Sequence, residues 1–249
     1  MPRDLSFSAL GVVLLTGVTL VMFRIGGLGR SREVLVVVVR AIVQMTVVGL
    51  VIAAVLRSPA LAPVYLAVML TAASVTSARR IAVPGRGPRA AAVTIVSASM
   101  ITVLVLVVSR AVTFDARHVV PLAAQVIGGA MTATSLAGQR FVDQVSSSWA
   151  EVEGWLALGA TPPVAVREQG RVAAARALVP VLDQTRNVGL VVLPGAYVGL
   201  LLGGATPLDA GRLQLLVLVG LMAAQSVAVV IVTRLLGPAL GLQRVGAAA

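Results

Sequence analysis

The 249-residue sequence contains no cysteine and no lysine, a single histidine and only 3% aromatic residues. The absence of cysteine excludes a secreted scaffold held together by disulfides. Charged residues make up 12% of the chain, against about 25% in soluble globular proteins. So few charges cannot cover an interior built from 58% apolar residues, and a disordered chain would contain far fewer apolar residues. The remaining class is a multi-pass membrane protein.

The net charge of +11 is carried entirely by arginine. A basic chain can indicate a nucleic-acid partner. This chain has few aromatic residues and no long basic run, and its arginines lie between apolar segments. Membrane topology explains that distribution better, so we expect contact with membrane lipid and no nucleic-acid partner.

Seven apolar segments are long enough to cross a bilayer, whose core of about 30 Å requires ~20 helical residues. Short connections rich in glycine and proline separate them, and no segment forms a separate soluble domain. We therefore predict an all-α, polytopic membrane helix bundle, one domain over 1–249 in a cell membrane. The predicted spans are roughly 5–23, 34–56, 61–78, 90–110, 119–139, 181–203 and 208–234.

The arginines alternate between the connections. If the first, third and fifth loops and the C-terminus face the cytoplasm, thirteen of the twenty arginines lie inside, five lie outside and two lie within spans. Positive charge is enriched in cytoplasmic loops. The distribution predicts an outer N-terminus, an inner C-terminus and an odd number of spans.

The longest connection, 141–180, contains the only extended polar region. Ser148 and Glu151 have the spacing of a capping box, which would start a short helix. Gly159 can adopt the left-handed conformation that ends such a helix, and Thr161-Pro162 is typical of the start of a second one. The first helix would carry an apolar stripe made of Trp149, Val152, Leu156 and Ala160.

This loop has two interpretations: an amphipathic helix pair on the membrane surface, or a docking element for a soluble partner. Trp149 and Trp155 are six residues apart, about 240° around a helix. One can therefore pack on the membrane domain while the other enters a partner's groove. The docking candidates are Trp149, Glu151, Glu153, Trp155 and Gly159.

Polar residues inside the spans are candidates for a substrate pathway, because such groups are costly in a bilayer. Arg40 and Gln44 share one helix face. Asp183, the only acid near a span, can pair locally with Arg186 or across helices with Arg40. Structural roles remain the alternative for all of them. The pathway candidates are Arg40, Gln44, Gln125, Met131, Asp183, Pro194 and Gly195.

Pro194 lies in the middle of the sixth predicted span, where a missing N–H would kink a helix. Gly195, Gly199 and Gly203 follow at intervals of four residues, which permits close helix packing. The segment is therefore either a packing seam or a hinge.

No catalytic constellation is visible. Gly85-Arg86-Gly87-Pro88 lacks the Gly-Lys-Ser/Thr of a phosphate loop, and no cluster of histidine or carboxylate has metal-ligand spacing. His118 reads as an interfacial residue. We expect a non-enzymatic chain that binds no cofactor itself.

Several strings resemble the FetB/YbbM family of ABC transporter permeases. The resemblance covers about 38–235, and its most specific parts are Leu158-Gly159-Ala160-Thr161-Pro162 followed by Leu193-Pro194-Gly195. Further matching strings are Arg40-Ala41-Ile42-Val43-Gln44 with Gly49, Gly128-Gly129-Ala130-Met131, Val188-Gly189-Leu190-Val191-Val192, and Pro207 with Gln214.

The resemblance implies a homodimeric permease that exports iron or another metal, with ATP bound and hydrolysed by a separate FetA-like ATPase subunit. The chain departs from the family pattern at Gly129, where the family has Asn, and at Ala196-Tyr197, where it has Met-Met. Both changes remove polar or soft groups that could bind a metal. A sugar nucleotide or lipid-like substrate, a stand-alone secondary transporter and a membrane scaffold are the alternatives.

Overall fold

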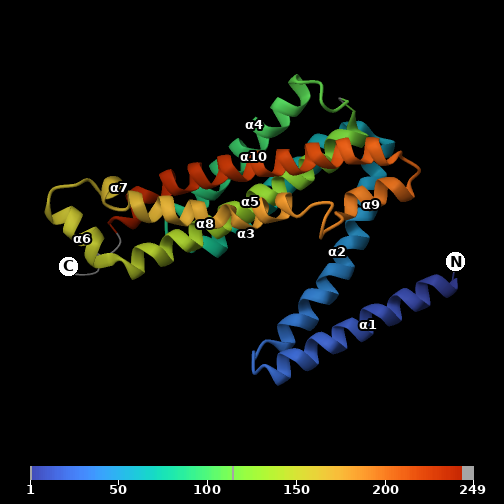
Figure 1. Ribbon diagram of the computed structural model, residues 1–249, viewed down its shortest axis with the longest axis horizontal. Coiled ribbons are helices and arrows are strands. Elements are labelled where there is room, and N and C mark those ends of the chain that lie inside the picture. Colours follow the sequence, from blue (N-terminus) through green and yellow to red (C-terminus); the bar gives the residue numbers. More distant parts are fainter. Residues whose placement is uncertain (1, 114, 243–249) are drawn as a thin grey trace. The chain divides into compact units, whose positions relative to one another are not determined.

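The computed structural model describes residues 2–113 and 115–242, and their regular structure is helical, apart from one isolated bridge between Val188 and Val192. The chain divides into two compact units, 1–61 and 62–249. The first unit contains α1 (Pro2–Ile25), α2 (Ser31–Arg57) and the short 3-10 helix η1 (Pro59–Leu61). Its helices α1 and α2 form a hairpin (Figure 1) whose apolar side chains are largely exposed, as suits helices surrounded by lipid.

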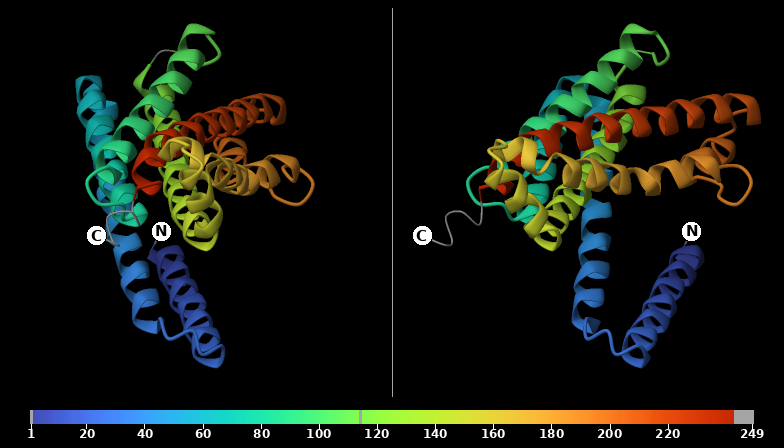
Figure 2. Two further views of the ribbon diagram at one scale, coloured as in Figure 1. Left: turned by 90° about the vertical axis from the view of Figure 1, so that its left-hand side faces the viewer. Right: turned by 60° about the vertical axis from the view of Figure 1, so that its left-hand side comes forward.

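The second unit is a helix bundle. Helices α4 and α5 pack against each other, both of them contact α3 and α10, and α8 packs against α5 and α10. Figure 2 shows that α6 and α7 lie at one end of α10, whereas α9 lies at the other end. The helices are α3 (Ala62–Ile81), α4 (Gly87–Val108), α5 (Ala116–Ser147), α6 (Trp149–Ala157), α7 (Pro162–Ala165), α8 (Arg167–Arg186), α9 (Gly195–Leu202) and α10 (Pro207–Leu240).

Small residues form much of the contact surface inside this bundle, because lipid provides little hydrophobic drive for helix association and close packing must replace it. A Cβ atom added to Gly138 of α5 would lie 2.6 Å from Ile81 Cγ1 of α3. Ser135 Oγ donates a hydrogen bond to Ser77 Oγ across the same pair of helices at 3.0 Å. The fully buried alanines are Ala91, Ala98, Ala130, Ala137, Ala210, Ala224 and Ala228.

Five helical segments in the described part of the chain are long and apolar enough to cross a membrane: Ser31–Arg57, Pro59–Ile81, Gly87–Val108, His118–Ser147 and Pro207–Leu240. They correspond to the predicted spans two to five and seven. Ala9–Ile25 is a shorter apolar stretch in the position of the first. The prediction of a polytopic helical membrane protein is confirmed, and the count of seven stays a prediction.

The sixth predicted span, 181–203, is wrong as a continuous helix. Helix α8 ends at Arg186, α9 begins at Gly195, and the chain between them is not helical. The predicted loop 141–180 is also different in form. Its first residues, 141–147, continue α5, and α8 runs through Pro180 with Ala173, Ala177 and Val181 buried against the bundle. Periodic small residues on one side of α8 therefore draw it into the core despite its charged outer side.

The arginines that are unevenly distributed over the loops of the sequence are concentrated at one end of the second unit. Gly138 approaches Ile81, and Gly241 approaches Pro162, so the ends of α3, α5 and α10 share one end with α6 and α7. We call this the arginine-rich end. Nine of the thirteen arginines in the described part of this unit lie toward it: Arg79, Arg80, Arg86, Arg89, Arg140, Arg167, Arg171, Arg176 and Arg234.

We predict that the arginine-rich end faces the cytoplasm. The chain has no native cysteine, so Ser147→Cys and Ala205→Cys each introduce a single thiol at opposite ends of the unit. A membrane-impermeant maleimide added to intact cells should modify Ala205→Cys, and should reach Ser147→Cys only after permeabilisation. The reverse pattern would contradict the orientation.

Candidate functional site

The pathway residues expected from the sequence are distributed over both units. Arg40 and Gln44 lie one turn apart on α2 in the first unit, and both side chains are exposed. In the second unit, Met131 packs against the hydrophobic core of the bundle, while Gln125 lies in the half of α5 away from the arginine-rich end. Of the expected set, Gln125 and Pro194 border one or other of the two cavities described below.

Asp183 lies in the last turn of α8. Its Oδ1 atom is 3.5 Å from Nη1 of Arg186, and both side chains are more than half exposed. This is the local pairing, one of the two alternatives for Asp183. Arg40 belongs to the other unit, and a pairing of Arg40 with Asp183 stays a prediction.

The chain between α8 and α9, 187–194, forms a turn that closes on itself. The N–H of Gly189 donates to the carbonyl of Val192 at 3.0 Å, and the N–H groups of Val191 and Val192 donate to the carbonyl of Asn187. Gly189 has a φ of 80°, a left-handed conformation that favours glycine. Non-helical backbone within a bilayer is tolerated where it meets protein or a water-filled cavity, so the surroundings of this break are the place to look for a candidate site.

The kink expected at Pro194 is wrong in form. Pro194 is the N-cap of α9, with a ψ of 141°, so α9 starts after the proline instead of a helix bending through it. The packing seam expected at the glycines of α9 is not formed within the described chain. A Cβ atom added to Gly195 or Gly199 would meet nothing within 4 Å, and one added to Gly203 would approach only carbonyls of its own helix.

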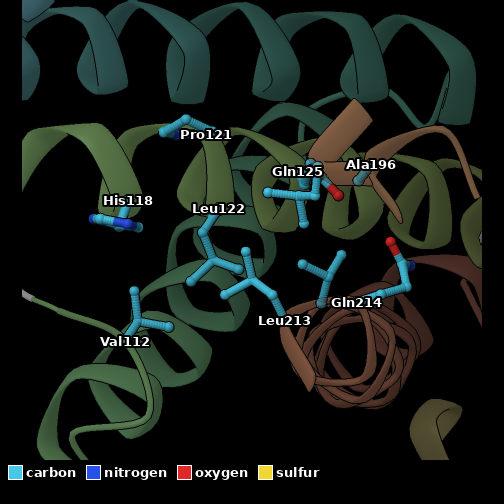
Figure 3. A pocket seen from close by; sticks show the side chains of 10 residues that line it. Val112, His118, Pro121, Leu122, Gln125, Ala196, Leu213 and Gln214 are labelled. Carbon is cyan, nitrogen blue, oxygen red and sulfur yellow. The ribbon is translucent and has the colours of Figure 1, made fainter. Parts of the chain in front are cut away.

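Two cavities flank α9. The first, of about 340 Å³, lies between α5, α9 and α10 (Figure 3). The second, of about 420 Å³, lies between the break and α10 and includes Pro194 and Tyr197. Mainly apolar cavities of about 300–1,000 Å³ with a few polar groups are typical small-molecule sites. The polar side chains that border the first cavity are His118, Gln125 and Gln214.

Gln214 of α10 borders both cavities. Gln214 is only 6% exposed, and within the residues that the structure describes its carbonyl oxygen Oε1 has no hydrogen-bond partner. A buried acceptor left without a donor costs about 1–3 kcal/mol, so a ligand or water that donates here would be stabilised. From the sequence, Gln214 and Gln225 are two polar groups of one apolar span, to which a structural role of joining helices was assigned. No sequence signal distinguished Gln214 from Gln225 as a candidate site residue.

His118 was expected to be interfacial, and it borders the first cavity at the start of α5. Its Nδ1 atom lies 2.7 Å from Asp115 Oδ1, and its backbone N–H donates to the same carboxylate at 2.8 Å. Asp115 thereby caps α5 and fixes the imidazole. Within the residues that the structure describes, no group of three or more histidines, cysteines or carboxylates could hold a metal ion.

At the arginine-rich end, the expected apolar stripe of α6 is confirmed. Val152 is fully buried, and Trp149, Leu156 and Ala160 pack against the main core. Trp155, by contrast, is 50% exposed, and Glu153 is exposed as well. The two tryptophans thus face different surroundings, as their spacing predicts.

The expected capping box is wrong. Ser148 makes no capping bond, and its hydroxyl accepts a hydrogen bond from Gln144 Nε2 at 3.3 Å. Glu151 accepts a bond from Gln169 Nε2 of α8 at 3.2 Å. Gln169 is 3% exposed, so this contact ties α6 to the buried side of α8. A long-range partner therefore replaces the local cap.

The chain reverses after α6 at Gly159, whose φ is 88°, and α7 begins with Pro162 after Thr161, as expected. Farther on, Arg171 donates two hydrogen bonds to the Glu168 carboxylate, at 2.6 and 2.9 Å. These bonds lower the pKa of Glu168 below its ordinary value. Both side chains are largely exposed, so the pair belongs to the solvated side of α8.

The chain is similar in sequence to known membrane proteins. A model described as "Uncharacterised protein family (UPF0014)" matches residues 7–240. The UPF0014 membrane protein STAR2 of Oryza sativa subsp. japonica is 38% identical over 214 residues, covering 85% of this chain and 75% of that protein. Protein ALUMINUM SENSITIVE 3 of Arabidopsis thaliana is 33% identical over 233 residues, covering 93% and 84%.

The Escherichia coli (strain K12) protein named "Probable iron export permease protein FetB" is 34% identical over 131 residues, covering 53% of this chain and 51% of that protein. No solved structure matches the chain. The resemblance found in the sequence is thus confirmed, with the match to the iron-related relative confined to about half of each chain.

Proposed function

Because the chain belongs to the UPF0014 family of multi-pass membrane proteins, we propose that it is the permease subunit of an ABC-type transporter that exports iron or another metal ion. A separate ATPase subunit, similar to the FetA partner implied by the resemblance, binds and hydrolyses ATP. Two copies of the permease would assemble with the ATPase. The family relative whose name states iron export supports the metal.

The observation that carries the proposal is the division of α6 into two sides. One side is fixed to the bundle through Val152 and through the bond between Glu151 and Gln169. The other side exposes Trp155 at 50% and places Leu158 just beyond the helix at 82%. A rigidly mounted helix with an exposed aromatic residue, at the end rich in arginine, suits the groove of a soluble partner.

The contact between α6 and α8 can transmit a movement of α6 to the cavities. Helix α8 is continuous from Arg167 to Arg186 and leads from the contact with α6 to the break at 187–194. A movement of α6 would therefore shift the end of α8 and the turn that follows it. In this proposal, ATP hydrolysis on the partner opens and closes the cavities beside α9.

We expect Trp155→Ala to reduce co-purification of the ATPase subunit at least about tenfold, since aromatic anchors in grooves commonly contribute ~2 kcal/mol or more. The chain, tagged and purified from its native cells in mild detergent, is compared with the variant by quantitative mass spectrometry. Arg171→Ala is the matched control, because Arg171 is exposed and pairs only with its neighbour Glu168.

The proposal fails if no ATPase subunit accompanies the wild-type chain. It also fails if ATP does not drive iron out of cells, or into inverted vesicles, that contain both subunits. Equal recovery with Trp155→Ala and Arg171→Ala would leave α6 as a surface helix and remove the structural support for docking.

A second candidate substrate is favoured by one observation. The residues that border the two cavities include no aspartate, glutamate or arginine, which suits an organic molecule better than an ion. A sugar nucleotide or lipid-like substrate is therefore the alternative cargo of the same ABC permease.

A further inference from the structure

The site around Gln214 offers hydrogen bonds of both kinds. Gln214 borders both cavities, and its buried carbonyl oxygen lacks a donor within the described part of the chain. Next to it begins α9, whose first N–H groups have no acceptor within the helix. Ala196, in the first turn of α9, borders the first cavity, and Tyr197 borders the second. A ligand that both donates and accepts would satisfy these groups together.

The same site is poorly suited to a bare metal cation. Neither cavity is bordered by a carboxylate or a thiol. The imidazole of His118 is already held through Nδ1 by Asp115, and the start of α9 carries the positive end of a helix dipole. Iron and its neighbours in the transition series prefer imidazole, thiolate or carboxylate ligands. An ion stripped of water would meet apolar walls and amides.

We propose that a metal cargo passes the Gln214 cavities inside an uncharged organic complex whose outer surface donates a hydrogen bond to the Gln214 carbonyl. The inference rests on the proposed export of metal and adds the chemical form of the cargo. The complex brings its own ligands, so the chain needs no metal site. Its uncharged surface removes the cost of placing an ion between apolar walls.

The test measures binding to the purified full-length chain in lipid nanodiscs. The probes are tris(acetohydroxamato)iron(III), a neutral complex with N–H donors on its surface, and Fe(II) as the hydrated ion. Radioactive iron and equilibrium dialysis report binding, and empty nanodiscs give the lipid background. The neutral complex should bind saturably, and Gln214→Leu should weaken it about tenfold through loss of the hydrogen-bond acceptor.

Gln225→Leu is the matched control. Gln225 lies on the same helix, α10, but borders neither cavity, so its replacement should leave the affinity unchanged. The proposal is overturned if Fe(II) alone binds in a way that Gln214→Leu abolishes, if Gln214→Leu and wild type bind the complex equally, or if neither probe binds. Recovery of the ATPase subunit with wild type, together with any of these results, would refute the chemical form and leave the permease assignment intact.

Discussion

Among the glycine-to-alanine changes in α5, Gly138→Ala should destabilise the second unit most. The new Cβ would lie 2.6 Å from Cγ1 and 2.8 Å from Cδ1 of Ile81, a side chain that is itself 97% buried. Crowding of this kind in a well-packed core costs about 1–3 kcal/mol. Thermal unfolding in detergent, followed by circular dichroism, should show a clearly lower midpoint and a lower folded yield.

Gly128→Ala is the control on the same helix, because a Cβ there meets nothing within 4 Å. Alanine favours a helix over glycine by about 1 kcal/mol, so this variant should be neutral or more stable. Ile81→Ala removes the crowding atoms and should offset part of the loss in the double variant with Gly138→Ala. Strictly additive losses would show that the two helices do not approach each other as described.

The sequence predicts the membrane class and the long helices well, because hydropathy depends on composition over a whole span of ~20 residues. It fails at 181–203 for the same reason. Leu190 and Val191 raise the mean hydropathy whether or not the backbone is helical. The local signals were present in the sequence: glycine at 189 favours the positive φ that the residue adopts, and Pro194 provides no N–H. Each was outweighed by the apolar residues around it.

For the polar loop 141–180 the error was the opposite one, because a segment expected to be solvated is partly buried. Its arginines suggested a solvated helix, yet Ala173 and Ala177 form the buried side of α8, and small residues give little hydrophobic signal. The capping box between Ser148 and Glu151 was predicted from their spacing of three residues alone. In the structure, the partner of Glu151 is Gln169, which lies 18 residues away. Contacts of that kind depend on how helices meet, which spacing along one helix does not contain.

At the candidate site too, some residues could be identified from the sequence and others only from the fold. Gln125 and Pro194 were found because polar residues and breakers inside spans are unusual. Gln214 gained its importance only from the fold, which places it between two cavities and buries its carbonyl without a donor. A glutamine near the end of a span has no such meaning until the neighbouring break and α9 are known.

Gly159→Val should uncouple ATP hydrolysis from transport while the chain still inserts into the membrane. Gly159 has a φ of 88°, where a non-glycine residue costs about 1–3 kcal/mol and a β-branched one is especially strained. A Cβ there would meet nothing within 4 Å, so the effect comes from backbone strain alone. The turn would relax and change the angle between α6 and α7. The measurement is the ratio of iron transported to ATP hydrolysed in proteoliposomes containing both subunits.

Gly154→Ala separates strain from a simple loss of glycine. Gly154 lies inside α6, has open space around it and needs no positive φ, so alanine should strengthen α6 and leave coupling intact. The chain's two tryptophans, Trp149 and Trp155, both lie on α6, and their fluorescence therefore reports on this helix alone. Gly159→Val should shift that emission and increase quenching of Trp149 by iodide, because the turn no longer holds α6 against the core. If coupling falls with unchanged fluorescence, the strain acts elsewhere. If both stay as in wild type, the α6 turn does not transmit force and the route through Gln169 and α8 to the cavities is refuted.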